Sequence, residues 1–316
     1  MLDERSTLHA RDPQGFLERL SALPDAYDGP DGVRPPPYGF DAAGGAAVLV
    51  PVVADWFDGR LTPSGTQFIA EGGFDDPAES AARRSAVEAA GAQVVVIAAE
   101  ADGDDADGSA SGSANVGDVS LPDDVFAPFH LVRYLAHATG HGAAGERLVA
   151  ALRAVADGAA ADRPTAENPA KALAWTLWQR VPLLVSDRGG AAAQGLLQQA
   201  FARVGKVLAV PTGAHGALVA AAAFEGRHAL GDDLVALVLG RTGPETDVIE
   251  EVLATRVAQV ERLRFDGGWL PPADPDPVVD AIVLWYAAMW VAAYGALLAG
   301  LDPSDDGVYG RVRAVA

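Results

Sequence analysis

The chain contains no cysteine, and this absence removes three kinds of chemistry at once. Without thiols there is no disulfide, no thiolate-ligated metal and no cysteine nucleophile. Basic residues are also scarce, with 23 Lys and Arg against 43 Asp and Glu, which gives a formal net charge of −20. A field of that sign repels nucleic-acid phosphates and anionic lipid head groups. We therefore expect neither a nucleic acid nor a membrane surface as a partner.

The signature motifs of several enzyme classes are missing as well. The sequence has no Gly-x-Ser-x-Gly elbow and no His-Glu-x-x-His pair, so nothing indicates a serine hydrolase or a zinc protease. Gly189 and Gly190 precede an Ala-rich segment but lack the spacing of a nucleotide loop, and we expect no cofactor. The charged start of the chain, Met1 to Arg5, differs from a secretion signal and indicates a cytoplasmic protein.

Composition predicts two domains. Half of the 316 residues are hydrophobic, which suffices for two separate cores. Residues 156–165 are of low complexity and divide the chain nearly in half, so we predict domains at residues 1–160 and 161–316. Pro, Gly and Asp at residues 23–37 predict irregular chain after a helix around Phe16 and Leu20. Residues 102–113, made only of Gly, Asp, Ala and Ser, predict a flexible loop.

Short apolar runs alternate with helical segments in both halves. The runs are β-branched and lack polar alternation, which is typical of parallel strands buried on both faces. We expect strands at residues 48–50, 93–98, 181–185, 207–210 and 234–239. We expect helices at residues 75–91 and 218–228, and others beginning at Asn168 and Gly190. The sequence thus predicts an α/β fold in which each domain is a parallel sheet flanked by helices, a flavodoxin-like three-layer sandwich.

One uncharged segment, residues 281–301, is long enough to cross a bilayer. Its aromatic residues Trp285 and Trp290 lie centrally rather than at the ends, and Asp280 and Asp302 flank it. This arrangement favours a helix buried between domains or between subunits over a membrane span. Because exposing such a segment would create a large apolar patch, we expect a homodimer and no membrane.

Three segments of the second half occur in the order found in one family. They are residues 167–184, which include Asn168-Pro169-Ala170-Lys171, residues 237–240 before a charged helix, and residues 294–303, which end in Asp302-Pro303. This half resembles the C-terminal sugar isomerase (SIS) domain of the bifunctional phosphoglucose/phosphomannose isomerases. The resemblance implies two SIS-type domains, a homodimer, and interconversion of glucose 6-phosphate or mannose 6-phosphate with fructose 6-phosphate.

The resemblance also implies a substrate site in the first half. It assigns substrate binding to a family Gly-Gly-Ser-Ala turn and a phosphate loop, which correspond here to Gly44, Gly45 and Ala46 and to Gly72 and Gly73. The hydroxyl residues of both motifs are replaced, and the loop carries Glu71, Asp75 and Asp76, whose carboxylates repel a phosphate. Phe129 stands where the family has an arginine, so a bidentate contact to an anion is lost.

The family's catalytic Asn-Glu-Asn-Ala-Lys aligns with residues 202–206, so that Arg203 replaces the glutamate base and Lys206 is kept. Of the family's His-Asn-Glu motif only His215 remains. The resemblance implies that Arg203 and Lys206 bind the anion and that His215 opens the sugar ring, serving the neighbouring subunit's pocket. Isomerisation needs a base, a ring-opening acid and a phosphate anchor. Two hypotheses stay open: an isomerase, or a non-catalytic SIS-domain dimer that senses a sugar phosphate or binds a partner.

Other candidate groups have simpler interpretations. His130, His137 and His141 have helical spacing that could serve zinc, but they lack a convincing fourth ligand, so we expect solvated surface histidines and no metal. An acid–base cluster of Glu225, His228 and Asp232 is alternatively a helix end with a favourable histidine. Tryptophans such as Trp175 and Trp178 could stack on a sugar, although packing within the protein is the default.

Overall fold

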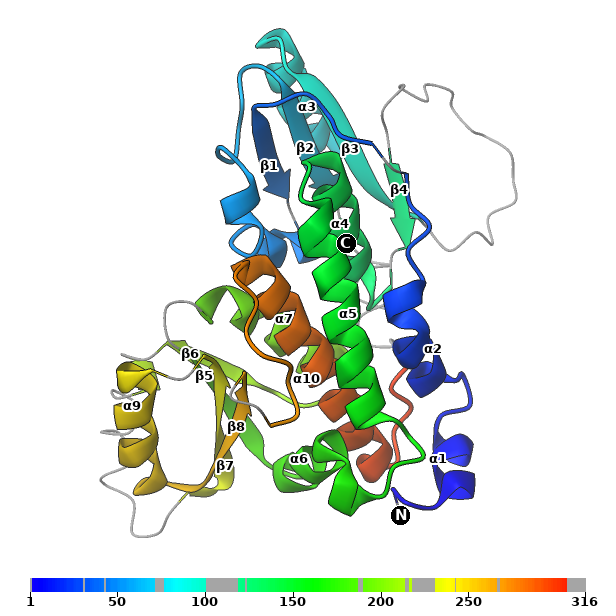
Figure 1. Cartoon of the computed structure of the whole chain (residues 1–316), viewed down its shortest axis with the longest axis vertical. Helices are drawn as coiled ribbons and strands as arrows, with labels where there is room; N and C mark the ends of the chain where they lie inside the picture. Colours follow the sequence, from blue (N-terminus) through cyan, green and yellow to red (C-terminus); the bar gives the residue numbers. More distant parts are fainter. Residues whose placement is uncertain are drawn as a thin grey trace. The chain divides into compact units, whose positions relative to one another are not determined.

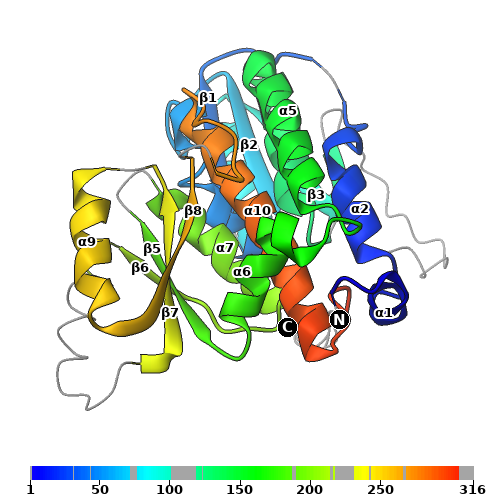
Figure 2. The same ribbon diagram turned by 60° about the horizontal axis from the view of Figure 1, so that its bottom comes forward.

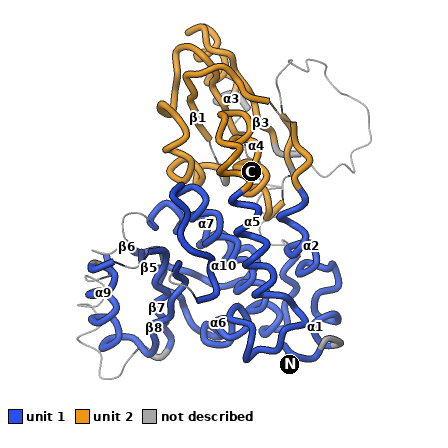
Figure 3. Tube along the Cα trace, in the orientation of Figure 1, with its two compact units in different colours: residues 1–26, 147–309 blue, residues 27–146, 310–316 orange. Residues whose placement is uncertain are grey.

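The computed structural model describes residues 2–30, 32–42, 44–71, 77–100, 119–122, 124–186, 190–213, 216–217, 231–241, 243–265 and 268–305, and Figure 1 labels their helices and strands. The chain forms two compact units (Figure 3). Unit 1 comprises Met1–Ala26 and Arg147–Tyr309, and unit 2 comprises Tyr27–Glu146 and Gly310–Ala316. These units are defined by compactness alone, and the division of the sequence between residues 160 and 161 stays a prediction.

Unit 2 is built on a parallel sheet in the order β1-β2-β3-β4. Its strands are β1 Tyr38–Ala42, β2 Thr66–Glu71, β3 Gln93–Glu100 and β4 Val119–Pro122. The helices are α3 Pro77–Ala89 between β2 and β3 and α4 Ala127–Ala138 after β4, with short 3-10 helices η2 Gly44–Leu49 and η3 Ala54–Trp56 after β1. The predicted strand at residues 93–98 is therefore confirmed by β3. The helix predicted at residues 75–91 is confirmed by α3 over Pro77–Ala89.

The strand expected at residues 48–50 is wrong. Those residues belong to η2 and the turn after it, where Leu49 alone is buried and Val48 and Val50 are half-buried. The strand that precedes α3 is β2, whose polar Gln67 concealed it from a search for apolar runs. Gln67 is fully buried because its amide is satisfied: Thr62 N donates to its Oε1 over 2.8 Å, and its Nε2 donates to the carbonyl of Arg60 over 2.8 Å.

Unit 1 contains a second parallel sheet, in the order β6-β5-β7-β8. Its strands are β5 Val181–Ser186, β6 Val210–Gly213, β7 Gly231–Gly240 and β8 Val257–Arg264. Its helices are α1 Arg5–Arg11, α2 Phe16–Ala22, the part of α5 (Gly142–Ala159) from Arg147 onward, α6 Pro169–Leu177, α7 Ala191–Arg203, α9 Pro244–Ala254 and α10 Pro277–Ala299, with short 3-10 helices η1 Leu23–Asp25 and η4 Thr165–Glu167.

Helices cover both faces of the unit 1 sheet (Figure 2). On one face, Ile249 and Leu253 of α9 pack against Leu183 and Val185 of β5. α6, α7 and α10 lie on the other face (Figure 2). The resulting three layers confirm the predicted α/β fold class, and the strands at residues 181–185 and 234–239 are confirmed with it. The third expected strand is displaced, since β6 begins at Val210 rather than at residue 207.

α10 is the one helix in the described chain that is long and apolar enough to span a membrane. It begins at the N-cap Asp276, whose side chain accepts from Val278 N, and ends at Gly300, whose φ is +75°. Within its most apolar 18-residue window, 94% of the residues are buried by the rest of the protein. A helix that is apolar all round and covered by its own chain is a core helix, as the sequence favoured.

The low-complexity segment at residues 156–165 and the segment predicted to be irregular at residues 23–37 both contain some helical structure. α5 continues through the low-complexity residues 156–159, so irregular chain begins only at Ala160. Among the described residues of the segment 23–37, η1, Leu23–Asp25, is helical and the others are irregular. The expected loop at residues 102–113 and the expected helix at residues 218–228 lie outside the described residues.

Candidate functional site

The carboxyl ends of β1 and β2 lie at the same edge of the unit 2 sheet, because the strands are parallel and Ala42 pairs with Ala70. Gly44, Gly45 and Ala46 open η2 directly beyond β1 and lie at that edge. Open parallel sheets bind ligands at edges of this kind. Gly72 and Gly73, which follow β2, lie outside the described residues. The assignment of these five positions to substrate binding stays a prediction.

Two arginines share one carboxylate near this edge. Arg60 donates from Nε to Oδ1 of Asp41 over 3.1 Å, and Nε of Arg83 on α3 lies 3.6 Å from Oδ2 of the same side chain. The Asp41 side chain is only 13% exposed, whereas the Arg60 side chain is 68% exposed, so water screens the charge of Arg60 more than that of Asp41. One carboxylate neutralises one guanidinium, which leaves this group of three with one positive charge in excess. Sequence reasoning missed the group because only the strand register and α3 bring its members together.

In unit 1, Arg203 and Lys206 lie near the amino ends of the strands, opposite to the carboxyl edge of the same sheet. α7 crosses from the carboxyl end of β5 to the amino end of β6, so its last residue, Arg203, lies near the strand amino ends. Lys206 has a φ of +55°, and its Nζ donates to the carbonyl oxygens of Arg203 and Asp305. A cation is favoured at this helix end. Within unit 1 these side chains are not at the carboxyl edge of the sheet, and their substrate roles stay predictions.

Two further positions come from the resemblance, Phe129 and His215. Phe129, at the position of the family arginine, is fully buried in α4, and its ring meets the His130 ring edge-on at 5.4 Å between centroids. A phenyl ring offers no donor to an anion. Phe129 therefore serves the core of unit 2. His215 lies outside the described residues, and its role in ring opening stays a prediction.

The three spaced histidines do not form a metal site. His130 is buried, and this burial lowers its pKa, although Asp124 and Asp28 oppose the shift. His137 stacks on Tyr27 with ring centroids 5.5 Å apart, and His141 stacks on Trp56 at 5.0 Å. Within the described chain no group of three or more His, Cys, Asp or Glu could hold a metal ion. The expectation of solvated surface histidines is wrong for His130, because helix α4 turns it inward.

Of the second candidate cluster, Glu225 and His228 lie outside the described residues.

The unit 1 sheet has its own topological switch point. β5 is central, and the chain leaves it toward β6 on one side while β7 and β8 lie on the other. At the carboxyl end of β5, Ser186 is fully buried and its Oγ has no hydrogen-bond partner among the described residues. Gly240 ends β7 with a φ of +88°, and a Cβ there would lie 3.9 Å from Gly190 Cα at the start of α7. Switch points of parallel sheets are places where ligands bind.

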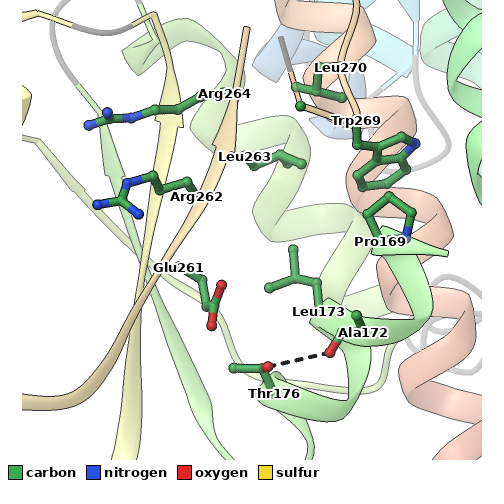
Figure 4. Close-up of a pocket in the computed structure, with 11 residues that line it drawn as sticks. Pro169, Ala172, Leu173, Thr176, Glu261, Arg262, Leu263, Arg264, Trp269 and Leu270 are labelled. Atoms are coloured by element: carbon green, nitrogen blue, oxygen red, sulfur yellow. Dashed lines mark hydrogen bonds between the residues drawn. The ribbon is translucent and has the colours of Figure 1, made fainter. Parts of the chain in front are cut away.

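A pocket of 340 Å³ lies in unit 1 between α6 and the edge strand β8 (Figure 4). Its walls are as polar as they are apolar and come from α6, from β8 and from the segment that follows β8. The apolar side chains among them are Pro169, Ala172, Leu173, Leu263, Trp269 and Leu270. Glu261 and Thr176 supply polar groups at one end. No motif marked these residues, because the pocket depends on where α6 packs beside the sheet.

Strand alternation separates the charges around this pocket. Arg262 and Arg264 also line the pocket, but their guanidinium groups point to the opposite side of β8 from Glu261 and Leu263 (Figure 4). On the far face Arg262 Nε donates to Glu250 Oε2 over 3.0 Å, and Arg264 pairs with Glu250 and lies 3.7 Å from Asp247. Two cations thus meet two carboxylates on that face, and Glu261 is left on the pocket side.

Two parallel four-stranded sheets, each flanked by helices, define an α/β protein with two units of similar architecture. The family model of the phosphoglucose isomerase N-terminal domain matches residues 16–140. The model of the bacterial phospho-glucose isomerase C-terminal SIS domain matches residues 166–314. The chain belongs to the phosphosugar isomerase family, with SIS domains of the phosphoglucose isomerase type. The resemblance read from the sequence is therefore confirmed.

Solved structures share this fold. A glucose-6-phosphate isomerase like protein from Thermus thermophilus is similar over 100% of this chain and 99% of its own, with 29% identity and a TM-score of 0.79. Glucosamine-6-phosphate deaminase from Thermotoga maritima shares the fold over 96% of both chains, with 9% identity and a TM-score of 0.54. A search of curated proteins with the sequence gave no match.

Proposed function

We propose that this chain binds a sugar phosphate at the carboxyl edge of the unit 2 sheet and does not isomerise it. The observation that carries the binding proposal is the pair of guanidinium groups, Arg60 and Arg83, around the single carboxylate of Asp41. Their excess positive charge compensates for the hydroxyl groups missing from the phosphate loop. It also acts locally against the unfavourable long-range field of a chain with a net charge of −20.

The absence of catalysis is proposed from the residue at the position of the base. Arg203 stands where the family has its glutamate, and a guanidinium is always protonated and accepts no proton. A general base contributes roughly 10²- to 10⁴-fold in rate. The amine of Lys206 is in addition held by two backbone carbonyls. We propose a binding or sensing role in the cytoplasm, as a homodimer.

Retained isomerase activity is the second candidate. It is favoured by the similarity to the glucose-6-phosphate isomerase like protein from Thermus thermophilus, which extends over the whole chain. The two candidates differ in one measurement. Conversion of fructose 6-phosphate, followed by coupled reduction of NADP⁺, distinguishes an isomerase from a protein that only binds.

Binding is tested by thermal unfolding with glucose 6-phosphate, mannose 6-phosphate and unphosphorylated glucose. A ligand that binds only the native state raises the melting temperature as its free concentration rises above its Kd, and we expect this only with the phosphorylated sugars. The double variant Arg60→Gln/Arg83→Gln is expected to lose the shift. Arg153→Gln, which removes an exposed arginine paired with Asp25, is the matched control and is expected to keep it.

Two results would contradict the proposal. One is a melting temperature that no sugar phosphate raises, and the other is turnover of fructose 6-phosphate that the double variant abolishes. Light scattering tests the dimer, which requires a mass near twice the 32.5 kDa of one chain.

A further inference from the structure

The polar end of the pocket in unit 1 has one carboxylate without a cation partner in the described chain. Glu261 is half-buried, and its Oε1 accepts from Gln259 Nε2 over 2.5 Å. The guanidinium of Arg180 donates to the amide oxygen of Gln259 over 3.4 Å and to the carbonyl of Thr176 over 2.8 Å. The Thr176 hydroxyl donates to the carbonyl of Ala172 over 3.3 Å, shown by the dashed line in Figure 4. Glu261 thus faces the pocket with acceptor capacity to spare.

The apolar end of the pocket is held rigidly. Trp269 Nε1 donates to the carbonyl of Val155 on α5 over 3.3 Å. The edge of the same indole lies against Gly158, where a Cβ would come within 2.8 Å of Trp269 Cδ1. Leu263 and Leu270 are almost completely buried. A wall fixed in this way offers a preformed apolar surface, which lowers the entropic cost of binding a small molecule.

We propose that this pocket binds a small organic cation that consists of a primary ammonium group on a compact aromatic body. The ammonium faces Glu261, and the body lies against Leu173, Leu263 and Trp269. The volume of 340 Å³ is at the lower end of the range for small-molecule sites, which sets the size of the body. An ammonium satisfies the carboxylate with a charge-assisted hydrogen bond and removes the cost of leaving it unpaired beside apolar walls.

Charge argues against an anionic ligand. An anion would meet Glu261 directly, and the cations nearest in sequence, Arg262 and Arg264, are engaged on the far face of β8. The net charge of −20 raises the local concentration of cations around the protein. This site is distinct from the sugar-phosphate site, since it lies in the other unit and takes the opposite charge. Either proposal can fail without the other.

Calorimetric titration of the whole chain with 2-phenylethylamine tests the proposal, and 2-phenylethanol and 3-phenylpropionate are the neutral and anionic comparators. Measurements at about 150 mM salt limit the reach of surface charges to ~8 Å. We expect the amine to bind at least about tenfold more tightly than the alcohol, and the carboxylate not to bind. Glu261→Gln keeps the shape of the side chain and removes its charge, so it is expected to weaken the amine at least about tenfold and to leave the alcohol unchanged. Glu251→Gln, at an exposed carboxylate on α9, is the matched control and should bind like the wild type.

Leu173→Trp, which fills the pocket, is expected to abolish binding of the amine. If circular dichroism shows that this variant is misfolded, the comparison of Glu261→Gln with Glu251→Gln still decides the question. Three results would overturn the proposal: no binding of the amine at millimolar concentration, equal affinity for amine and alcohol, or an affinity that Glu261→Gln and Glu251→Gln lower equally. The last result would assign the binding to the general negative field of the chain.

Discussion

The ammonium nitrogen of Lys171 lies 2.9 Å from the carbonyl oxygen of Leu2, so a fully buried lysine on α6 holds the first residues of the chain. The same nitrogen donates to the carbonyls of Ala161 and Arg163 over 2.9 and 2.6 Å, and lies 3.5 Å from Asp3. Three donors thus meet three carbonyl acceptors, which is the full capacity of an ammonium group. The resemblance identified Lys171 as part of a motif, and the structure shows that it joins three segments of unit 1.

Replacing Lys171 by Met should lower the free energy of unfolding by about 3 kcal/mol or more, because several carbonyl groups lose their donor together. Arg153→Met is the control, since Arg153 pairs with Asp25 in an exposed ion pair that is worth at most ~1 kcal/mol. Urea unfolding of both variants measures the difference. Equal losses would show that the buried ammonium contributes no more than a surface charge.

Two tyrosines of α10 bind backbone groups of other helices. Tyr286 donates to the carbonyl of Leu20 over 2.6 Å, and Tyr294 donates to the carbonyl of Ala159 over 2.7 Å. Burial raises the pKa of both hydroxyls, so both stay protonated donors. Each carbonyl keeps a second donor, Leu23 N for Leu20 and Asn168 Nδ2 for Ala159, so each change to Phe should cost about 1 kcal/mol of unfolding free energy, the net contribution of one hydrogen bond. Tyr27→Phe, which removes an exposed bond to Pro30, should cost clearly less in the same urea titration.

Substitution by alanine should have opposite effects on stability at two helical glycines, Gly158 and Gly295. A Cβ at Gly158 of α5 would lie 2.8 Å from the Trp269 ring, whereas one at Gly295 of α10 would have no atom within 4 Å. Gly295→Ala should stabilise the protein by up to about 1 kcal/mol through helix propensity. Gly158→Ala should destabilise it by ~1 to 3 kcal/mol, because a rigid indole must move and its bond to Val155 is strained. Thermal unfolding of both variants checks the sign of each effect.

His130 predicts a pH dependence of stability. Its burial holds its pKa below the ordinary value of 6.5, so the folded state binds this proton less readily than the unfolded chain does. The contribution of neutral, buried His130 to the free energy of unfolding is therefore complete above pH 6.5, and it is lost as the pH falls from that value through the pKa of the folded state. Between about pH 7 and 5, His130→Gln should lose less stability than the wild type. His9→Gln, at an exposed position, should follow the wild type, and a His130 resonance titrating at or above 6.5 by NMR would contradict the assignment.

Most helices and strands whose formation depends on residues close in the sequence could be predicted from short sequence patterns. Asn168 and Pro169 predicted the start of α6, and Asn168 Oδ1 accepts from Lys171 N over 3.0 Å as an N-cap should. The apolar run at residues 93–98 predicted β3 in the same way. Prediction failed where burial of a polar residue depends on distant chain. Gln67 in β2 is buried only because the loop at residues 60–62 satisfies its amide.

The sequence by itself determined the fold class, the family and the burial of α10, because these follow from periodicity, motif order and the apolar composition of continuous segments. The tertiary structure decided which charges meet. Asp41 contacts Arg60 and Arg83 only through the sheet and α3, and Glu261 is separated from Arg262 because alternate residues of β8 face opposite sides of the sheet. Such pairings depend on strand register and helix placement, which long-range contacts fix and which no local pattern of residues encodes.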